Sequence, residues 1–180
     1  MTNTSATPEP NTRPRRKWSG WAINIGLILI VFLVIQWWQT RSMVSGEAPD
    51  LAGQLISGKP FELSSLKGQP VLVHFWASWC PVCKMGEGDI AQLTRGHEVI
   101  TVAMQSGDPI EISAYLAEKG LTFPVLSDPD GEIASAWGVP GVPANFILDA
   151  SGTIHSTTVG YTTKQGIEAR LWAARHMGAE

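Results

Sequence analysis

The sequence is poor in residues that bind metals or form disulfides. Its 180 residues include two cysteines and four histidines. A structural zinc site needs four such ligands, and the chain has neither a second Cys-x-x-Cys pair nor a closely spaced pair of histidines. The histidines are scattered along the chain, at His74, His97, His155 and His176. We therefore predict no metal site, and any redox chemistry of the protein's own side chains must pass through Cys80 and Cys83.

Basic residues are scarce in the second part of the chain. All but one of the 16 acidic residues lie at or after Glu47, whereas a compact basic cluster, Arg13 to Lys17, lies near the N-terminus. An acidic domain has no surface that attracts a phosphate backbone. Nucleic acid is therefore excluded as a partner. The two parts of the chain are expected to face different surroundings.

Charged residues are absent from an apolar segment, Trp21–Trp38. As a helix this segment would be ~27 Å long, close to the thickness of a bilayer core. The basic cluster upstream predicts a cytoplasmic N-terminus, and tryptophans at both ends fit interfacial anchors. The segment is longer than a signal-peptide core, and Val44-Ser45-Gly46 is only a weak cleavage site. We predict a disordered cytoplasmic tail (1–17), a transmembrane helix (18–38), a tether (39–47) and one domain (48–180).

The domain alternates strand and helix patterns. Short apolar runs predict buried strands, and segments bounded by proline and glycine predict helices. This order predicts an α/β fold with a mixed central β-sheet flanked by helices. The expected strands are 71–76, 99–104, 146–149 and 153–159; the expected helices are 83–93, 110–119 and 163–176.

The pair Cys80-Pro81-Val82-Cys83 directly follows the first of these strands. If Cys83 lies one turn along a helix from Cys80, both sulfurs meet at the helix N-terminus. Backbone N–H groups and the positive end of the helix dipole stabilise a thiolate there. This pattern favours a dithiol redox pair. Half of a zinc site or two unrelated buried thiols are the alternatives.

Two stretches resemble the thioredoxin superfamily, particularly its membrane-anchored TlpA-like class: residues 74–84, containing Trp79-Cys80-Pro81-Val82-Cys83, and residues 141–149, containing Val142-Pro143. Residues 123–125, 137–143 and 159–163 further resemble the bacterial suppressor-of-copper-sensitivity subgroup. The resemblance covers about Ala48 to Met177. It implies a thioredoxin-like fold and protein disulfide oxidoreductase activity, without a cofactor beyond the redox-active Cys80–Cys83 disulfide.

The resemblance also implies roles for individual residues. Cys80, exposed at the helix start, would be the nucleophile, and Cys83, shielded one turn later, would resolve the mixed disulfide. Trp79, Pro81 and Val82 would form an apolar rim on which a client protein docks. The first two residues of this rim could equally serve packing alone.

The Val142–Pro143 bond resembles the cis-proline bond of the family, which presents the preceding backbone to a bound client chain by strand addition. Pro140 lies in the same stretch and competes for this assignment. The strand pattern that follows favours Pro143.

The chain departs from the family at two positions. His74 stands where thioredoxins carry a buried acid that assists proton transfer at the resolving cysteine. A histidine could do this near neutral pH, or it could be a buried imidazole without a catalytic effect. TlpA-like reductases also tend to carry an acid in the loop after the strand that corresponds to residues 99–104. In this chain the nearest acid is Asp108, displaced by about one residue from that position.

The function favoured by this resemblance is a thiol–disulfide oxidoreductase on the periplasmic side of a bacterial inner membrane, held by a single-pass anchor in the bilayer. Its partners would be exported client proteins with cysteines. A reductase would also need a DsbD-like transmembrane electron donor, because a dithiol does not stay reduced unaided in an oxidising compartment. TlpA-like relatives favour this direction, and the subgroup suggests copper tolerance.

Two other functions are weighed against this one. The two thiolates could hold Cu(I) as a copper-handling module. However, the chain has no Met-rich or His-rich tract, and a two-thiolate site gives no role to Val142–Pro143. A thiol peroxidase would need proline and threonine seven and three residues before the nucleophile. The chain has Val73 and Ala77 at these positions and so lacks the hydroxyl donor.

Overall fold

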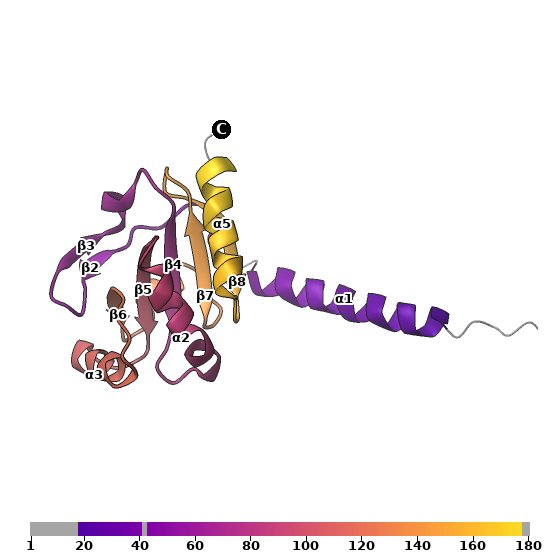
Figure 1. Ribbon diagram of the computed structural model, residues 1–180, viewed down its shortest axis with the longest axis horizontal. Coiled ribbons are helices and arrows are strands. Elements are labelled where there is room, and N and C mark those ends of the chain that lie inside the picture. Colours follow the sequence, from indigo (N-terminus) through magenta and orange to yellow (C-terminus); the bar gives the residue numbers. More distant parts are fainter. Residues whose placement is uncertain (1–17, 41–42, 178–180) are drawn as a thin grey trace, which may run out of the picture. The chain divides into compact units, whose positions relative to one another are not determined.

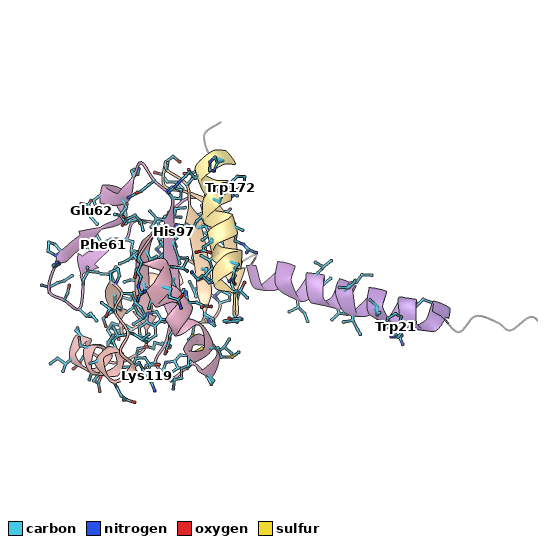
Figure 2. All side chains as sticks on the ribbon, in the orientation of Figure 1. Trp21, Phe61, Glu62, His97, Lys119 and Trp172 are labelled. Carbon is cyan, nitrogen blue, oxygen red and sulfur yellow. The ribbon has the colours of Figure 1, made fainter. Side chains whose placement is uncertain are left out.

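The computed structural model describes residues 18–40 and 43–177. By its contacts the chain divides into two units, Met1–Ile35 and Gln36–Glu180. Helix α1 spans Trp18–Thr40, and its described apolar side chains, Trp21 among them, are mostly exposed (Figure 2). Across the described residues, no helix combines the length and the apolar character needed to cross a membrane. The tail expected at 1–17 lies outside the described residues.

The second unit is built on a six-stranded mixed sheet with the strand order β1-β8-β7-β4-β5-β6. Strands β4, β5 and β6 are parallel, whereas β7, β8 and β1 continue the sheet from β4 as antiparallel neighbours. A separate two-stranded sheet pairs β2 with β3. The strands are β1 (Gly46–Glu47), β2 (Ala52–Gln54), β3 (Pro60–Glu62), β4 (Val71–Trp76), β5 (Glu98–Met104), β6 (Val125–Asp128), β7 (Ala144–Leu148) and β8 (Thr153–Val159).

Four α-helices and one short 3₁₀ turn complete the unit. Helices α2 and α5 lie together over one face of the sheet, in front of β4 and β7 in Figure 1. Helix α4 packs against β5 and β6 and contributes Ala134 to the opposite face. The helices are α2 (Pro81–Leu93), α3 (Pro109–Lys119), α4 (Glu132–Ala136) and α5 (Lys164–Met177), and the 3₁₀ turn is Leu63–Leu66.

The central strand β4 is buried along its whole length. Because side chains alternate across a strand, its residues divide between two cores. Leu72 and Trp76 join the core under α2 and α5, which also contains both cysteines. Val73 and Phe75 join the core on the other face. The predicted thioredoxin-like arrangement of a mixed sheet between helices is therefore confirmed.

Most helix limits agree closely with those expected. Helix α3 ends at Lys119 and is capped by Gly120, whose φ of 63° is left-handed and suits a glycine. Helix α2 begins at Pro81, two residues before the expected start. Proline fits there because the first helical N–H has no partner within the helix.

The folded unit begins earlier than the boundary expected at Ala48. Gly46 and Glu47 pair with Ile154 and Thr153 of β8, within the segment predicted as a tether. Met43 is buried in the core on the α4 face. Residues Arg41 and Ser42 lie outside the described residues. The later part of the expected tether therefore belongs to the folded unit, with Met43 in its core and Gly46–Glu47 in its sheet.

Candidate active site

The cysteine pair lies at the junction between β4 and α2. Cys80 is the N-cap residue of α2, and its Sγ accepts a hydrogen bond from the Cys83 N–H at 3.2 Å. This N–H is one of the donors that a helix leaves unpaired at its N-terminus, so it is free to stabilise negative charge on the sulfur. Both cysteines are free thiols. The geometry expected for a dithiol at a helix start is therefore present.

Exposure does not separate the two thiols, contrary to expectation. Cys80 is 4% exposed and Cys83 is 3% exposed, so the first cysteine is as buried as the second. Their environments differ instead. Burial, the neighbouring Cys80 sulfur and the charge of Glu87 raise the pKa of Cys83 to about 12. Cys83 is therefore held as a thiol at neutral pH.

A second segment reaches the first cysteine from across the sheet. The Val142–Pro143 peptide bond is cis, the isomer expected there, and within the described residues no other cis bond occurs. The Val142 carbonyl oxygen lies 3.5 Å from Cys80 Sγ, within hydrogen-bonding distance for the thiol. Pro143 is buried and its carbonyl accepts a hydrogen bond from Gly160, whereas Pro140 is exposed. The loop before β7 is thus placed directly against the reactive sulfur.

An apolar rim surrounds this junction. Trp79 and Val82 are 55% and 40% exposed, and Pro81 is also exposed. The Trp79 indole donates to the Gln105 carbonyl at 2.9 Å, which fixes the ring although it is open to solvent. Met85, one turn along α2 from Val82, is 69% exposed and was not predicted as part of the rim. Residues three apart on a helix lie on the same face, so the spacing from Val82 could have predicted that Met85 belongs to the rim.

Gln105, which holds Trp79, has an unusual backbone conformation. Its φ is 48°, the left-handed region that residues other than glycine seldom adopt. The adjacent Ser106 hydroxyl accepts a hydrogen bond from the Ser78 N–H at 3.0 Å. These two bonds tie the loop after β5 to the cysteine loop. Asp108 is not part of this connection: its carboxylate caps α3 by accepting from Ile110 and Glu111.

His74 lies beside Cys83 but does not titrate near neutral pH. Both residues line a small hollow with Pro143 and Asn145. Burial lowers the pKa of His74 to about 4, against the opposing effect of its hydrogen bond with Asn145 at 2.8 Å. Of the two possibilities raised for His74, the structure shows the buried, hydrogen-bonded imidazole, and a catalytic role stays a prediction. The Asn145 amide donates to Thr158, so its oxygen faces His74, and Nδ1 must carry the imidazole proton.

A buried acid near Cys83 was missed by the sequence analysis. Glu87 is 9% exposed and lies four residues after Cys83 on α2, where side chains share a face. The Tyr115 hydroxyl of α3 donates a hydrogen bond to its carboxylate. The i, i+4 spacing from Cys83 was a usable signal for Glu87. Nothing in the sequence paired it with Tyr115.

The chain matches the AhpC/TSA family over residues 44–157. This stretch is more than half of its length and contains the cysteine pair and the cis-proline loop. The chain belongs to the AhpC/TSA family.

Curated relatives agree on the chemistry. A thioredoxin-like protein of Haemophilus influenzae is 30% identical over 158 residues, covering 87% of this chain and 94% of the relative. The thiol-disulfide oxidoreductase ResA of Bacillus anthracis is 30% identical over 136 residues, covering 73% and 78% of the two chains. The protein is thus a thioredoxin-like thiol–disulfide oxidoreductase.

Solved structures agree on the fold. A thiol:disulfide interchange protein of Chlorobium tepidum has a TM-score of 0.63 at 29% identity, covering 73% of this chain and 97% of that one. The exposed lipoprotein thioredoxin Etrx1 of Streptococcus pneumoniae has a TM-score of 0.59 at 30% identity, covering 69% and 98%. Oxidoreductases of this family use their own cysteine pair as the redox group. Among the described residues, no group of three or more His, Cys, Asp or Glu side chains could hold a metal ion.

Proposed function

We propose that the protein reduces disulfides in exported client proteins, with Cys80 as the nucleophile and Cys83 as the resolving thiol. The observation that carries this assignment is the placement of Cys80. Its sulfur lies between the N-terminus of α2 and the Val142 carbonyl beside the cis bond, whereas Cys83 is held protonated by its raised pKa. A thiolate stabilised by backbone N–H groups attacks, and a protonated thiol does not.

The first step is attack of the Cys80 thiolate on one sulfur of a client disulfide. A Cys80–client disulfide forms, the client disulfide breaks, and the second client sulfur leaves as a thiolate. In the second step Cys83 attacks the Cys80 sulfur. The Cys80–Cys83 disulfide forms, the remaining client sulfur leaves as a thiol after taking the proton of Cys83, and two electrons have passed to the client.

The second step requires Cys83 to lose its proton inside the protein. His74 is suitably placed because it lines the same hollow as Cys83 and its Nε2 is free of a proton. We assign to the neutral imidazole the role of a hydrogen-bond acceptor that relays the proton. Its pKa of about 4 argues against a stably charged imidazolium at neutral pH.

Docking of the client is assigned to the apolar rim and to the loop beside the cis bond. Trp79, Pro81 and Val82 offer exposed apolar surface next to Cys80. An extended client segment would pair with the backbone at Val142 and Pro143, which brings its disulfide to the Cys80 sulfur. Backbone pairing suits an enzyme with many clients because it reads no particular side chain.

The proposed location is the periplasmic face of a bacterial inner membrane. The support comes from the uncharged segment Trp21–Trp38, which falls within helix α1, with the basic cluster before it. The relative from Streptococcus pneumoniae is named as an exposed lipoprotein. This location would place the N-terminus in the cytoplasm, the anchor in the bilayer and the domain outside.

A reductase in an oxidising compartment must be reduced again after each turnover. We therefore propose a DsbD-like transmembrane protein as the electron donor. The resemblance of residues 123–125, 137–143 and 159–163 to the copper-sensitivity subgroup supports a further role in copper tolerance.

The assignment of the two cysteines is tested by trapping in cells that express the full chain. Cys83→Ala should accumulate mixed disulfides with client proteins because the attacking sulfur remains and the resolving sulfur is absent. Cys80→Ala should trap none. Trapping in Cys80→Ala and not in Cys83→Ala would reverse the two roles.

The direction of electron flow needs a separate measurement. Alkylation of the wild-type protein in intact cells should find Cys80 and Cys83 mostly reduced, and loss of the electron donor should turn them into the disulfide. A pair that is mostly oxidised in normal cells would instead make the protein an oxidase.

A further inference from the structure

A tight turn carries the chain from strand β4 to Cys80. The Ala77 carbonyl accepts a hydrogen bond from the Cys80 N–H at 3.1 Å, so Ser78 and Trp79 are the two central residues of a four-residue turn. This bond does not use the N–H of Ser78, which is half-buried. A backbone N–H that is shielded from water needs an acceptor, so the Ser78 N–H must find one outside the turn.

Ser106 supplies this acceptor. Its hydroxyl accepts a hydrogen bond from the Ser78 N–H at 3.0 Å and donates one to the Met104 carbonyl at 3.0 Å. Ser106 is only 8% exposed, and Met104 is the last residue of strand β5. A hydroxyl can accept and donate at once, whereas an apolar side chain of similar size can do neither. Ser106 therefore connects the turn before Cys80 to the end of a central strand.

The residue before Ser106 holds the same turn by a different contact. The Gln105 carbonyl accepts from the Trp79 indole N–H at 2.9 Å, and the Gln105 N–H donates to the Asp128 carbonyl at 2.8 Å. The left-handed φ of Gln105, 48°, is a conformation that surrounding contacts must impose, and such conformations cluster at functional sites. Two consecutive loop residues thus hold two consecutive turn residues, one through its backbone and one through its side chain.

We propose that Ser106 is a positioning residue for client docking: its hydroxyl holds the turn at Ser78 and so keeps Trp79 in the orientation that receives a protein client. The inference rests on the proposed docking of clients at the apolar rim. Without the hydroxyl, the Ser78 N–H loses its acceptor and the ordered turn becomes one of several conformations. A client that binds the ordered form then loses apparent affinity in proportion to the population of that form. The Cys80 sulfur keeps its own contact with the Cys83 N–H, so its reactivity is retained.

The test compares a protein disulfide with a small one in the full-length protein. Insulin, reduced with dithiothreitol as the electron source, needs the docking surface, whereas the small disulfide DTNB needs only the Cys80 sulfur. Ser106→Ala should raise the KM for insulin about tenfold and leave kcat within about twofold of the wild type. The rate constant of the reduced protein with DTNB should stay within about twofold as well. A serine that served stability alone would change the folded fraction and leave all of these constants unaltered per folded molecule.

A second serine on the same loop provides the matched control. The Ser127 hydroxyl donates to the Gly107 carbonyl at 3.3 Å, a bond that holds the loop but does not involve the turn. Ser127→Ala should therefore keep the wild-type KM for insulin. An equal rise in KM for Ser127→Ala and Ser106→Ala would assign the effect to general loosening of the loop, and the specific role of Ser106 would be overturned.

A double variant tests whether Ser106 acts through Trp79. Trp79→Phe keeps an aromatic ring but removes the N–H that binds the Gln105 carbonyl, so it should also raise the KM for insulin. If Ser106 orients this ring, the double variant should raise KM by less than the product of the two single effects. Single effects that simply multiply would overturn this route.

The outcomes also separate this inference from the function on which it rests. If Trp79→Ala leaves the KM for insulin unchanged, docking at the rim is wrong and the inference fails with it. If Trp79→Ala raises KM but Ser106→Ala does not, only the role of Ser106 is overturned. A parallel loss in the DTNB reaction of Ser106→Ala would place its effect on Cys80 itself and would equally overturn a role in docking.

Discussion

The two faces of the central sheet are built from the same strands but from different residue types. In β4, β5 and β7, the buried polar residues His74, Thr101 and Asn145 all lie on the face that carries the cysteines. Their neighbours along each strand point to the other face and are apolar. An apolar face can be packed for stability, and a face with titratable groups can support chemistry. The alternation of a β-strand separates the two tasks.

The rings show the same division. On the α4 face, Phe146 contacts Phe75 and Trp137 at centroid distances of 5.6 and 4.9 Å. On the cysteine face, the Trp76 ring packs against the tilted ring of Tyr115, whose hydroxyl donates a hydrogen bond to Glu87. The contacts of the first cluster join aromatic rings to one another. The second connects packing to the site.

The largest loss of stability should come from a substitution in the core on the α4 face of the sheet. Phe146→Ala removes a fully buried ring from the centre of its cluster and should lower the free energy of unfolding by about 3–5 kcal/mol. Urea unfolding of the reduced protein measures this loss. The exchange rate per folded molecule should change little because Phe146 faces away from the cysteines.

The half-buried Phe61 of β3 provides the matched control. Phe61→Ala removes the same ring from a site that is already partly hydrated, so the loss should be clearly smaller. A loss below about 1 kcal/mol in Phe146→Ala would mean that the aromatic cluster is not the main source of stability.

Local patterns in the sequence predicted much of this molecule. The strands, the helices and the cysteine pair follow from apolar runs and from proline and glycine, and the resemblance supplied the cis bond. The early start of the sheet was not predictable because β1 has two residues and no apolar pattern. Strand β1 forms by pairing with the edge of β8, which lies more than a hundred residues away in the sequence.

The electrostatics of the site depended on contacts that the sequence does not encode locally. Burial in the assembled fold keeps His74 neutral, and its hydrogen-bond partner Asn145 lies 71 residues away in the sequence. Glu87 is fixed by Tyr115, 28 residues away on another helix. The equal burial of the two cysteines likewise depends on the loop that brings Val142 over Cys80. Each of these features requires the tertiary fold.

A smaller effect should appear on the cysteine face as a dependence on pH. The pKa of His74 is near 4 in the folded protein and 6.5 when unfolded, so the unfolded state binds more protons between these values. The contribution of His74 to stability is therefore complete above pH 6.5 and falls as the pH drops toward 4. The total loss should be about 3 kcal/mol.

The measurement compares unfolding of the wild type and His74→Gln across this range. The difference between them isolates His74 from the carboxylates, which also titrate in acid. His155→Gln, on an exposed position of β8, should follow the wild type. Parallel curves for the wild type and His74→Gln would show that the imidazole is not kept neutral by burial.

The smallest expected change in the free energy of unfolding concerns the hydroxyl of Thr101. This residue lies on the cysteine face of β5, whereas its neighbours on the other face are apolar. Thr101→Val keeps the shape of the side chain but removes the acceptor of the Trp76 indole N–H. A buried donor without a partner costs about 1–3 kcal/mol, and Pro124 O keeps its bond from the Thr101 backbone N–H. Thr157→Val on the half-buried strand β8 should stay within about 0.5 kcal/mol. Urea unfolding could instead give equal losses of free energy for the two variants. The Thr101 hydroxyl would then contribute nothing to holding Trp76, and the two faces would differ in residue type without a difference in stabilising contacts.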